Sequence, residues 1–245
     1  MRWLPVCAST NSVLLEFPAP PPGAPATVLV ADAQSAGRGR RGRAWLSQPG
    51  AGLTFSLRRS FDLPNMAGMT GLSLVVGLAV AAALENLGAA GLGLKWPNDI
   101  EAGGCKLGGV LVELGSAQGA VWAVMGIGIN LTLPASLRAE IDVPATDLAT
   151  LLGQPPEREA VLAAILVELA GRLAEFERKG FAPFAGAWQV RNVHAGREVR
   201  IVDDGRVVQQ GLCLGVAADG ALLLQTPAGV QAVIAGDVSL RAAGD

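Results

Sequence analysis

Short runs of apolar and β-branched residues, some alternating with polar residues, recur along the first half of the chain. Runs of this length predict strands, and alternation indicates strands with one buried face. The predicted strands are residues 26–34, 53–59, 91–96, 106–114 and 120–131. A proline-rich run at 18–25 and a glycine-, arginine- and serine-rich run at 35–52 predict loops.

Residues 66–88 are almost entirely apolar and predict a buried helix that ends near Gly88. The uncharged stretch 63–84 also has the length of a membrane span, which needs about 20 apolar residues. It contains Pro64, Asn65 and several glycines, and no basic cluster anchors it. We therefore expect a helix of the protein core and no membrane contact.

A second helix is predicted after Pro155 and Pro156, because proline is tolerated in the first turn of a helix. Gly180 suits the position just past its end, and a short helix is predicted at 184–188. The apolar residues of the long helix recur at helical spacing, at Leu162, Ile165, Leu169, Leu173 and Phe176.

From about Arg191 the chain changes to short β-type runs separated by Asp-Asp-Gly, Asp-Gly and Pro-Ala-Gly turns. This pattern predicts a small all-β barrel of about 50 residues. We predict a larger domain of residues 1–190 and a C-terminal domain of residues 191–245. The larger domain is predicted to be α+β, with a mixed or antiparallel sheet and helices on one side.

Composition narrows the possible functions. A net charge of -2 argues against general nucleic-acid binding, which needs a broad basic surface. Cys7, Cys105 and Cys213 have no CxxC or zinc spacing, which indicates reduced thiols in a cytoplasmic protein. The N-terminus has no signal-peptide pattern, and the single histidine, His194, excludes a histidine-rich metal site.

Lysine usage is unusual, with 16 arginines and only three lysines. Two of the lysines, Lys95 and Lys106, lie 11 residues apart beside Trp, Pro, Asn, Asp and Gly residues. Chance is the plain explanation. The alternative is that these positions need the compact point charge of lysine, which a planar guanidinium cannot replace.

Residues 37–43 read Gly-Arg-Gly-Arg-Arg-Gly-Arg. Glycines allow close approach of the backbone to a ligand, backbone amides can bind an anion, and arginine recognises phosphate or carboxylate. The segment is not a P-loop, because no Gly-Lys-Ser/Thr follows. It predicts an anion-binding loop, with a solvated basic loop or a nucleic-acid contact of the RGG type as the alternative.

Residues 95–99, Lys-Trp-Pro-Asn-Asp, predict a strand end and a turn, and residues 106–113 open a glycine-containing strand. Two lysines would then lie near one pocket, with Asp99 able to hold Mg²⁺ or position a lysine. The alternative is a hairpin with exposed ends, in which Trp96 only fills the core.

Two shorter segments are less specific. Residues 126–130, Gly-Ile-Gly-Ile-Asn, resemble the start of a dinucleotide fingerprint, but the last glycine and the following helix are missing. Close backbone approach to a ligand remains open. Residues 9–12, Ser-Thr-Asn-Ser, are typical of a helix N-cap; alternatively they hydrogen-bond the polar head of a ligand.

Together and in this order, these segments resemble the biotin protein ligase family. The family pattern is STN, a Q-x-A-G-R-G-R-x-G-R-x-W loop, KWPND, K-x-x-G-[IV]-L-V-E and G-x-G-x-N, and the C-terminal β segment resembles the family's SH3-like domain. The resemblance covers essentially the whole chain. Ala8 stands where an acidic residue often precedes STN, and the chain begins about eight residues before STN. We therefore expect the form without an N-terminal DNA-binding domain.

The resemblance implies a class II synthetase-like ligase core and a two-step reaction. Biotin and ATP give biotinyl-5′-AMP and pyrophosphate, and a specific lysine of a biotin carboxyl carrier domain then takes the biotin. ATP and Mg²⁺ are expected at the site, with Asp99 as a possible Mg²⁺ ligand. A homodimer is expected from the family, and no DNA or membrane contact.

The resemblance also implies the site residues, with Lys106 and Arg40 as the catalytic pair. The implied biotin-binding residues are Ser9, Thr10, Asn11, Gln34, Gly37, Arg38, Gly39, Arg40, Lys106, Gly108, Gly109, Val110, Gly126 and Gly128. The implied ATP-binding residues are Arg40, Arg41, Trp45, Lys95, Asn98, Asp99, Lys106, Asn130 and Arg241. The alternatives are a lipoate or octanoate ligase of the same superfamily and a non-catalytic biotin-binding regulator.

Overall fold

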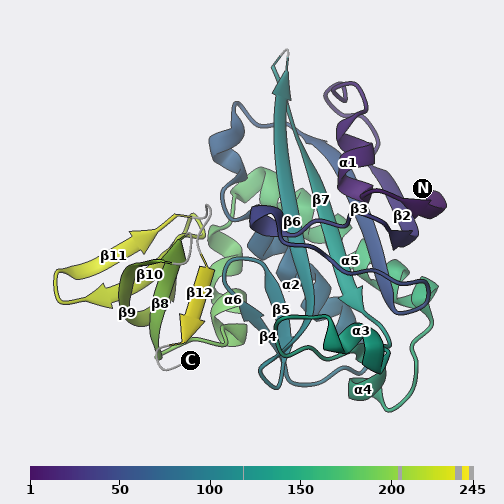
Figure 1. Ribbon diagram of the computed structural model, residues 1–245. Helices are drawn as coiled ribbons and strands as arrows, with labels where there is room; N and C mark the ends of the chain where they lie inside the picture. The colour runs from purple at the N-terminus through teal and green to yellow at the C-terminus, as the bar shows by residue number, and fades with distance from the viewer. Residues whose placement is uncertain (118, 204–205, 235–238, 243–245) are drawn as a thin grey trace.

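The computed structural model describes residues 1–117, 119–203, 206–234 and 239–242, the last four by their backbone only. These residues form a seven-stranded sheet and a five-stranded sheet, with helices packed on the larger one (Figure 1). The chain passes from one sheet to the other between Arg191 and Glu198. The domain division at 190–191 stays a prediction.

The main sheet is mixed. It contains β1 (Arg2–Cys7), β2 (Thr27–Gln34), β3 (Gly52–Phe61), β4 (Leu92–Lys95), β5 (Asp99–Ala102), β6 (Cys105–Ala117) and β7 (Ala120–Asn130). The order is β1-β2-β3-β7-β6-β5-β4; β1 and β2 are parallel and the other neighbours are antiparallel. The predicted α+β class is confirmed. The sequence did not predict β1, a largely exposed edge strand, or β5, which follows the turn at Asn98 directly.

Alternation gives the main sheet two different faces, because successive side chains of a strand point to opposite sides. On β3, Leu53, Phe55 and Leu57 join the main hydrophobic core. Thr54 and Ser56, between them, are buried on the other side. On β7 glycines alternate with core residues in the same way. One face is therefore apolar, and the other is rich in polar residues and glycine.

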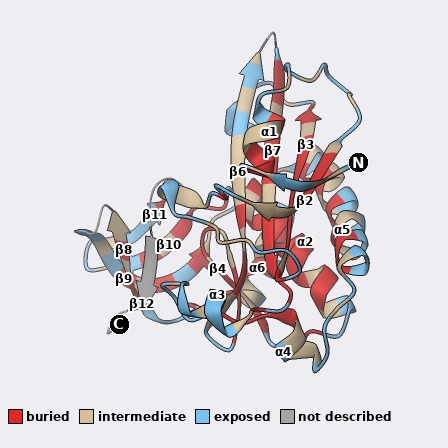
Figure 2. Cartoon of the chain, turned by 45° about the vertical axis from the view of Figure 1, so that its right-hand side comes forward, coloured by how far each residue is buried: buried red, intermediate tan, exposed pale blue. Residues whose placement is uncertain are grey.

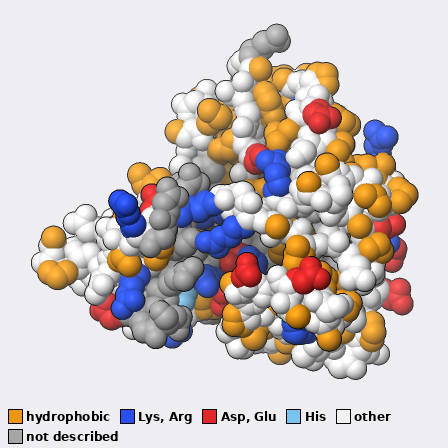
Figure 3. Space-filling model, viewed as in Figure 1, with side chains coloured by type: hydrophobic (Ala, Val, Ile, Leu, Met, Phe, Trp, Pro, Cys, Tyr) orange, Lys and Arg blue, Asp and Glu red, His pale blue; other side chains and the backbone are white. Residues whose placement is uncertain are grey.

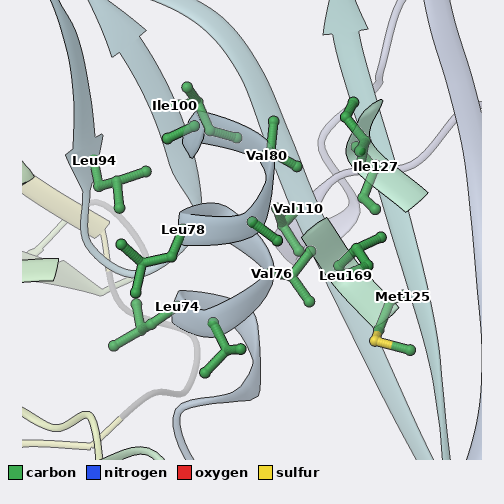
Figure 4. Packing of buried hydrophobic residues seen from close by; sticks show 14 of the residues in the cluster. Leu74, Val76, Leu78, Val80, Leu94, Ile100, Val110, Met125, Ile127 and Leu169 are labelled. Atoms are coloured by element: carbon green, nitrogen blue, oxygen red, sulfur yellow. The ribbon is translucent and has the colours of Figure 1, made fainter. Parts of the chain in front are cut away.

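Helix α2 (Leu72–Asn86) covers the apolar face over β4, β5 and β6. Figure 4 shows Leu74, Leu78 and Val80 of this helix beside Leu94 and Ile100 of the sheet. By length and apolar content Met66–Asn86 would suffice for a membrane span, but 67% of its apolar window is buried inside the protein. It is the core helix that the sequence predicts.

The predicted single helix at 66–88 is wrong in one respect. A short 3-10 turn, η2 (Met66–Met69), is separated from α2 by a break at Gly71. Gly71 has a φ of 79°, in the left-handed region, and a Cβ there would lie 2.7 Å from the Phe181 side chain. Only glycine fits both the conformation and the contact.

Helix α5 (Arg158–Lys179) packs on α2 and against β3. Its predicted stripe, Leu162, Ile165, Leu169, Leu173 and Phe176, is buried, which confirms the prediction. Figure 2 shows the buried side of α5 turned toward the sheet. Gly180 ends the helix with a φ of 66°, as predicted. The chain continues as η3 (Ala182–Phe184) and α6 (Ala185–Arg191), where a short helix was predicted.

The short helix α1 (Thr10–Leu15) lies on the opposite face and contacts β2, β3 and β7. Ser9 caps it, since its Oγ accepts a hydrogen bond of 3.5 Å from Ser12 N. The helix-cap interpretation of this segment is confirmed. Two further short helices, α3 (Ala135–Ala139) and α4 (Leu148–Leu152), were not predicted.

The C-terminal sheet is antiparallel. Its strands are β8 (Glu198–Asp203), β9 (Arg206–Val216), β10 (Leu222–Thr226), β11 (Gly229–Val233) and β12 (Ser239–Ala242). Their order, β11-β10-β9-β8-β12, leaves β11 and β12 at opposite edges, so the described pairings form a sheet and not the closed barrel predicted. The indole of buried Trp96 donates 3.1 Å to Gly220 O and ties this sheet to the KWPND turn.

Candidate active site

Strand register brings distant motifs together on the polar face. Lys95 pairs with Asp99, Asp99 with Gly109, Gly109 with Gly128, and Gly128 with Thr54. Directly paired residues of neighbouring strands have their side chains on the same face. The KWPND turn and both glycine-containing strands therefore meet in one row across this face.

Two glycines of this face make room for side chains that lie over it. A Cβ on Gly126 would lie 2.4 Å from Asn11 Oδ1, and a Cβ on Gly128 would lie 2.5 Å from the Trp45 indole. Both approaches are shorter than real Cβ contacts. The glycines thus let α1 and the arginine-rich loop lie directly on the sheet.

A buried polar cluster joins α1 to the sheet. Ser56 Oγ lies 2.6 Å from both Asn11 Oδ1 and Thr10 Oγ1, and Thr10 donates to Gln34 Oε1 from its backbone N at 2.7 Å and its hydroxyl at 3.1 Å. The hydroxyls of Thr10 and Ser56 each have one hydrogen to donate, while together they make three contacts: with each other, with Asn11 and with Gln34. The cluster can therefore reorient its hydrogens to donate to a ligand or accept from it.

Glu113 connects this cluster to the arginine-rich loop. Its carboxylate accepts a hydrogen bond of 2.8 Å from Asn11 Nδ2 and forms an ion pair of 3.0 Å with Arg38. Asn11 Nδ2 also donates to Leu111 O at 3.2 Å. The loop is therefore held above the polar cluster by a charged side chain of β6.

The arginine-rich loop itself is a small hairpin. Arg38 and Ala44 form a β-bridge, Gly39 N donates to Arg43 O at 2.7 Å, and Trp45 N donates to Gly37 O at 2.9 Å. Its tip is the 3-10 turn η1 (Arg40–Gly42), in which Arg41 has a φ of 57°. A loop with this many internal hydrogen bonds presents its arginines at defined places.

Trp45 and the loop nearly fill the space next to the glycine row. The cavity bordered by Trp45, Thr54 and Asn130 measures about 10 Å³. Sites for small molecules are usually about 300 to 1,000 Å³. The cavity beside Trp45 is therefore too small to hold a small-molecule ligand as it stands.

Lys106 lies at the start of β6, beside the glycine row. Its ammonium is 2.7 Å from Asp99 Oδ1. A Cβ on Gly109 would meet Lys106 Nζ at 3.6 Å, an ordinary contact. A methyl group would fit over Gly109, in van der Waals contact with the side chains of Lys106 and Asp99. Lys95, next in the row, pairs with Glu101 at 3.3 Å.

The backbone around Lys106 is held by a second polar cluster. Lys106 N donates to Pro144 O at 2.8 Å, and Thr146 N donates to Lys106 O at 2.9 Å. Asn130 Nδ2 donates to Thr146 O at 3.0 Å and, at 3.3 Å, to Lys106 O. The segment 144–146 acts as a short parallel strand beside Lys106 and fixes the position of its main chain.

Asp147 anchors that segment. It is 3% exposed and accepts from Leu133 N at 3.0 Å and Thr150 N at 2.8 Å, and it pairs with Arg138 at 2.8 Å. Burial raises the pKa of this carboxyl, but these hydrogen bonds and the guanidinium outweigh burial and hold the pKa below its ordinary value of 3.8. Asp147 is therefore a charged structural group.

The remaining KWPND residues are also structural. Trp96 is buried in the core. The amide of Asn98 donates 2.9 Å to Val110 O, and Asn98 O accepts 2.9 Å from Val110 N. These two bonds clamp the turn to β6, so that Asp99 starts β5 opposite Gly109. The lysine and aspartate of the motif reach the site because the residues between them are fixed.

Cations dominate the chemistry of the site. Figure 3 shows lysine and arginine side chains gathered along the boundary between the two sheets. Four cations of the site form ion pairs: Arg38 with Glu113, Arg41 with Asp203, Lys95 with Glu101, and Lys106 with Asp99. Such an arrangement suits binding and aligning an anionic ligand, and it contains no histidine base.

Two family models match this chain. The Biotin/lipoate A/B protein ligase family matches residues 3–130, and the Biotin protein ligase C terminal domain matches residues 194–241. The chain is 36% identical to the bifunctional ligase/repressor BirA of Escherichia coli over 98% of its own length and 74% of the relative's. The chain belongs to the biotin protein ligase family. It is a ligase, and the family supports biotin ligation as its activity.

Further relatives agree with this membership. The biotin–[acetyl-CoA-carboxylase] ligase of Paracoccus denitrificans is 35% identical over 94% of this chain and 96% of its own. The biotin protein ligase of Aquifex aeolicus, solved in complex with biotin and ATP, has a TM-score of 0.82 and 34% identity, covering 99% of this chain and 98% of that one. Because the Escherichia coli relative is named a repressor, the absence of DNA binding stays a prediction.

The structure brings many of the residues implied by this membership to one face. Thr10, Asn11, Gln34, Gly37, Arg38, Trp45, Lys95, Asp99, Lys106, Gly109, Gly126, Gly128 and Asn130 all contribute to the row, the clusters or the loop described above. Gly39, Arg40 and Arg41 lie at the tip of that loop. The side chain of Arg241, on β12, lies outside the described residues.

Two implied residues do not reach this face with a side chain. Val110 lies in the main hydrophobic core, and Gly108 pairs with core residues Ile100 and Ile129. Both alternate with Gly109, so the Val110 side chain and the Cα hydrogen of Gly108 that a side chain would replace face the core. Ser9 caps α1, and Asn98 is used by the turn. The residue that sequence reasoning missed is Ser56, for which alternation in residues 53–59 was the signal.

Within the described part of the chain, no three His, Cys, Asp or Glu side chains cluster as metal ligands. Asp99, paired with Lys106, is the carboxylate that the row itself offers. A magnesium ion that binds mainly through phosphates needs only one or two protein carboxylates. The donor set therefore fits a magnesium ion brought in with a nucleotide.

Proposed function

We propose that this ligase joins biotin and ATP into biotinyl-5′-AMP and then transfers the biotin to a specific lysine of a biotin carboxyl carrier domain. The observation that carries the proposal is the position of the Lys106 ammonium, beside Gly109 of the glycine row and 2.7 Å from Asp99 Oδ1, at the edge of the polar face. The relatives named biotin–[acetyl-CoA-carboxylase] ligase support the class of acceptor.

The polar cluster suits the ring end of biotin. The ring is neutral, so it needs a few directed hydrogen bonds in a largely apolar pocket. Thr10, Ser56 and Gln34 supply hydroxyl and amide groups there, with Ser56 fully buried. Gly126 and Gly128 have no side chains, so they leave space above the sheet at the bottom of the pocket.

The first step needs charge neutralisation more than a base. A biotin carboxylate oxygen bonds to the α-phosphorus of ATP, and the bond from that phosphorus to the bridging oxygen breaks, so that pyrophosphate leaves with the electron pair. Lys106 is close enough to the row to stabilise the carboxylate and phosphate oxygens as charge shifts. Positioning and electrostatic stabilisation account for most catalysis of this kind.

The second step is attack of the neutral acceptor amine on the biotinyl carbonyl carbon, which releases AMP. Until that attack, the mixed anhydride must be kept from water. The hairpin loop that covers the site, with Trp45 lying on Gly128, is suited to exclude water. Arg40 lies at its tip, and we propose that it contacts the adenylate.

Mg²⁺ is part of the proposal, with Asp99 as its protein ligand. When bound, it would neutralise phosphate charge as pyrophosphate leaves. A homodimer is proposed on the family resemblance, a cytoplasmic location on the three free thiols, and absence of DNA binding on the net charge of -2.

The test is ATP–pyrophosphate exchange by the purified chain with Mg²⁺ and either biotin or lipoate. Exchange that requires biotin is expected, followed by labelling of a carrier domain and not of its lysine-to-arginine variant. Exchange with lipoate alone would contradict the proposal in favour of a lipoate ligase. Exchange with neither would contradict adenylation altogether.

A further inference from the structure

The arginine-rich loop is fixed to the protein at three places. Arg38 pairs with Glu113 of β6, and Trp45 lies on Gly128 of β7. Both of these contacts go to the main sheet. The third goes to the C-terminal sheet, where Arg41 at the loop tip forms an ion pair with Asp203 at the end of β8.

The backbone of Arg41 indicates that its side chain is needed at that point. Among the described residues it is the one non-glycine residue with positive φ, at 57°. A long side chain in the left-handed region is strained and persists where the surrounding structure holds it. Gly42, next to it, also has a positive φ, of 70°, which glycine adopts without strain.

The ion pair is half-sheltered. The side chain of Arg41 is 15% exposed and that of Asp203 is 46% exposed. Arg41 Nη2 makes the contact with Asp203 Oδ1. A pair of this kind is strong enough to bias a loop and weak enough to break during turnover.

The bias toward a closed loop affects catalysis, because the loop covers the site. Trp45, at the base of the loop, lies on Gly128 of the glycine row, so a ligand that binds over this row must displace the loop in each turnover. Opening separates the loop tip from the C-terminal sheet, because η1 is the part farthest from the base of the hairpin.

We propose that Arg41 and Asp203 form a latch, by which the C-terminal sheet holds the loop closed over the site. Arg41 is then a positioning residue. The latch sets how long the loop stays shut on the reactive intermediate, which deepens the proposed function and rests on it.

The first test needs no activity. Trypsin cleaves after arginine, and the loop carries Arg38, Arg40, Arg41 and Arg43. Asp203→Asn leaves all four in place and removes the latch. We expect about threefold faster loop cleavage than in the parent, as for loss of a partly exposed ion pair. Glu198→Gln, an equal charge change at an exposed position on the same strand, is the control.

Two further variants separate the latch from a general loss of folding. Asp203→Glu keeps the charge and all four loop arginines and should restore slow cleavage, and Arg41→Lys, which keeps both the charge and a trypsin site, should cleave as slowly as the parent. High salt should speed cleavage of the parent and leave Asp203→Asn nearly unchanged. Equal cleavage of Asp203→Asn, Glu198→Gln and parent would overturn the latch.

The second test uses the intermediate. Asp203→Asn should release biotinyl-5′-AMP about threefold faster, with the KM for ATP unchanged. A raised KM for ATP in Arg41→Ala alone would assign Arg41 to the nucleotide and overturn the latch. Absence of biotin-dependent exchange in the parent would contradict the proposed function, while the cleavage test would still decide whether the latch exists.

Discussion

The two faces of the main sheet are built from the same strands and do different work. On the face covered by α2 and α5, leucine, valine and isoleucine side chains pack into one continuous core. On the opposite face, the intervening positions include glycine, serine, threonine and asparagine, with a small apolar cluster of Leu29 and Val124 beneath α1, and α1 and the arginine-rich loop cover it. The first face holds the fold together, and the second leaves room and polar atoms for a ligand.

The difference shows that a strand can form part of a binding site when only the residues on one of its faces change. On β7 the core positions bear Met125, Ile127 and Ile129, and the positions between them bear Gly126 and Gly128. Removing side chains from one face costs no packing on the other, because the two sets never touch. The stability of the fold and the chemistry of the site can therefore be changed separately.

Lys106→Ala should give the largest loss of activity. The substitution changes the polar face of the sheet and leaves the apolar face intact. We expect adenylation to slow by about 3 kcal/mol, roughly a hundredfold, since one electrostatic contact to the transition state is lost. ATP–pyrophosphate exchange measures it. Lys179→Ala, at an exposed lysine on α5 paired with Glu175, is the matched control and should exchange normally. Similar rates for the two variants would remove Lys106 from the chemistry.

Leu169→Ala makes the complementary change on the helical face. Leu169 is fully buried, and truncating such a leucine costs about 3 kcal/mol of unfolding free energy, or roughly 6 to 12 °C in Tm for a chain of this size. Exchange per folded molecule should stay normal at 20 °C. A loss of exchange in fully folded protein would mean that the two faces are coupled.

Gly108 and Gly109 are neighbours on opposite faces and sharpen the comparison further. A Cβ on Gly108 would meet Gly128 O at 2.6 Å, so Gly108→Ala should lower Tm. A Cβ on Gly109 meets nothing nearer than 3.4 Å, so Gly109→Ala should fold normally. It should weaken biotin or ATP binding by about 1 to 3 kcal/mol through overpacking against the ligand, as calorimetry can show. Normal binding by Gly109→Ala would place the ligand elsewhere.

The smallest effect concerns Asp147, behind Lys106. Its pKa is lowered in the folded protein, so its ionised form stabilises the fold above the pKa of the unfolded chain, and this stabilisation is lost as pH falls through the folded pKa. Asp147→Asn should cost about 1.5 kcal/mol at pH 7. The difference from the parent should shrink below about pH 4. A difference independent of pH, in urea unfolding, would contradict a charged Asp147.

Much of this arrangement was predictable from sequence, for a physical reason in each case. The stripe from Leu162 to Phe176 has helical spacing, and the break to short β runs near Arg191 marks the second sheet. The motifs around Lys95 and Lys106 indicated one pocket because a short turn joins them. The structure brings Lys106 and Asp99 within 2.7 Å.

The rest depends on contacts that no local pattern contains. Ser56 reaches the site because β3 pairs with β7 in one particular register, and sequence spacing does not specify that register. Asp203 meets Arg41 across 162 positions of chain. Gly71 breaks a run that looks wholly helical, because the Phe181 side chain packs against it. In each case tertiary packing decided the outcome.

The central claim is that the ligand binds on the polar, glycine-rich face. The helical side has a cavity of its own, about 380 Å³, between α2, α5 and α6, with Arg172 and Arg191 in its lining. A crystal structure of this chain with biotin and ATP decides between the two places. We predict ligand density over Gly109 and Gly126, beside Lys106 and beneath the loop. Density in the cavity between α2, α5 and α6, with the glycine row empty, would contradict the account.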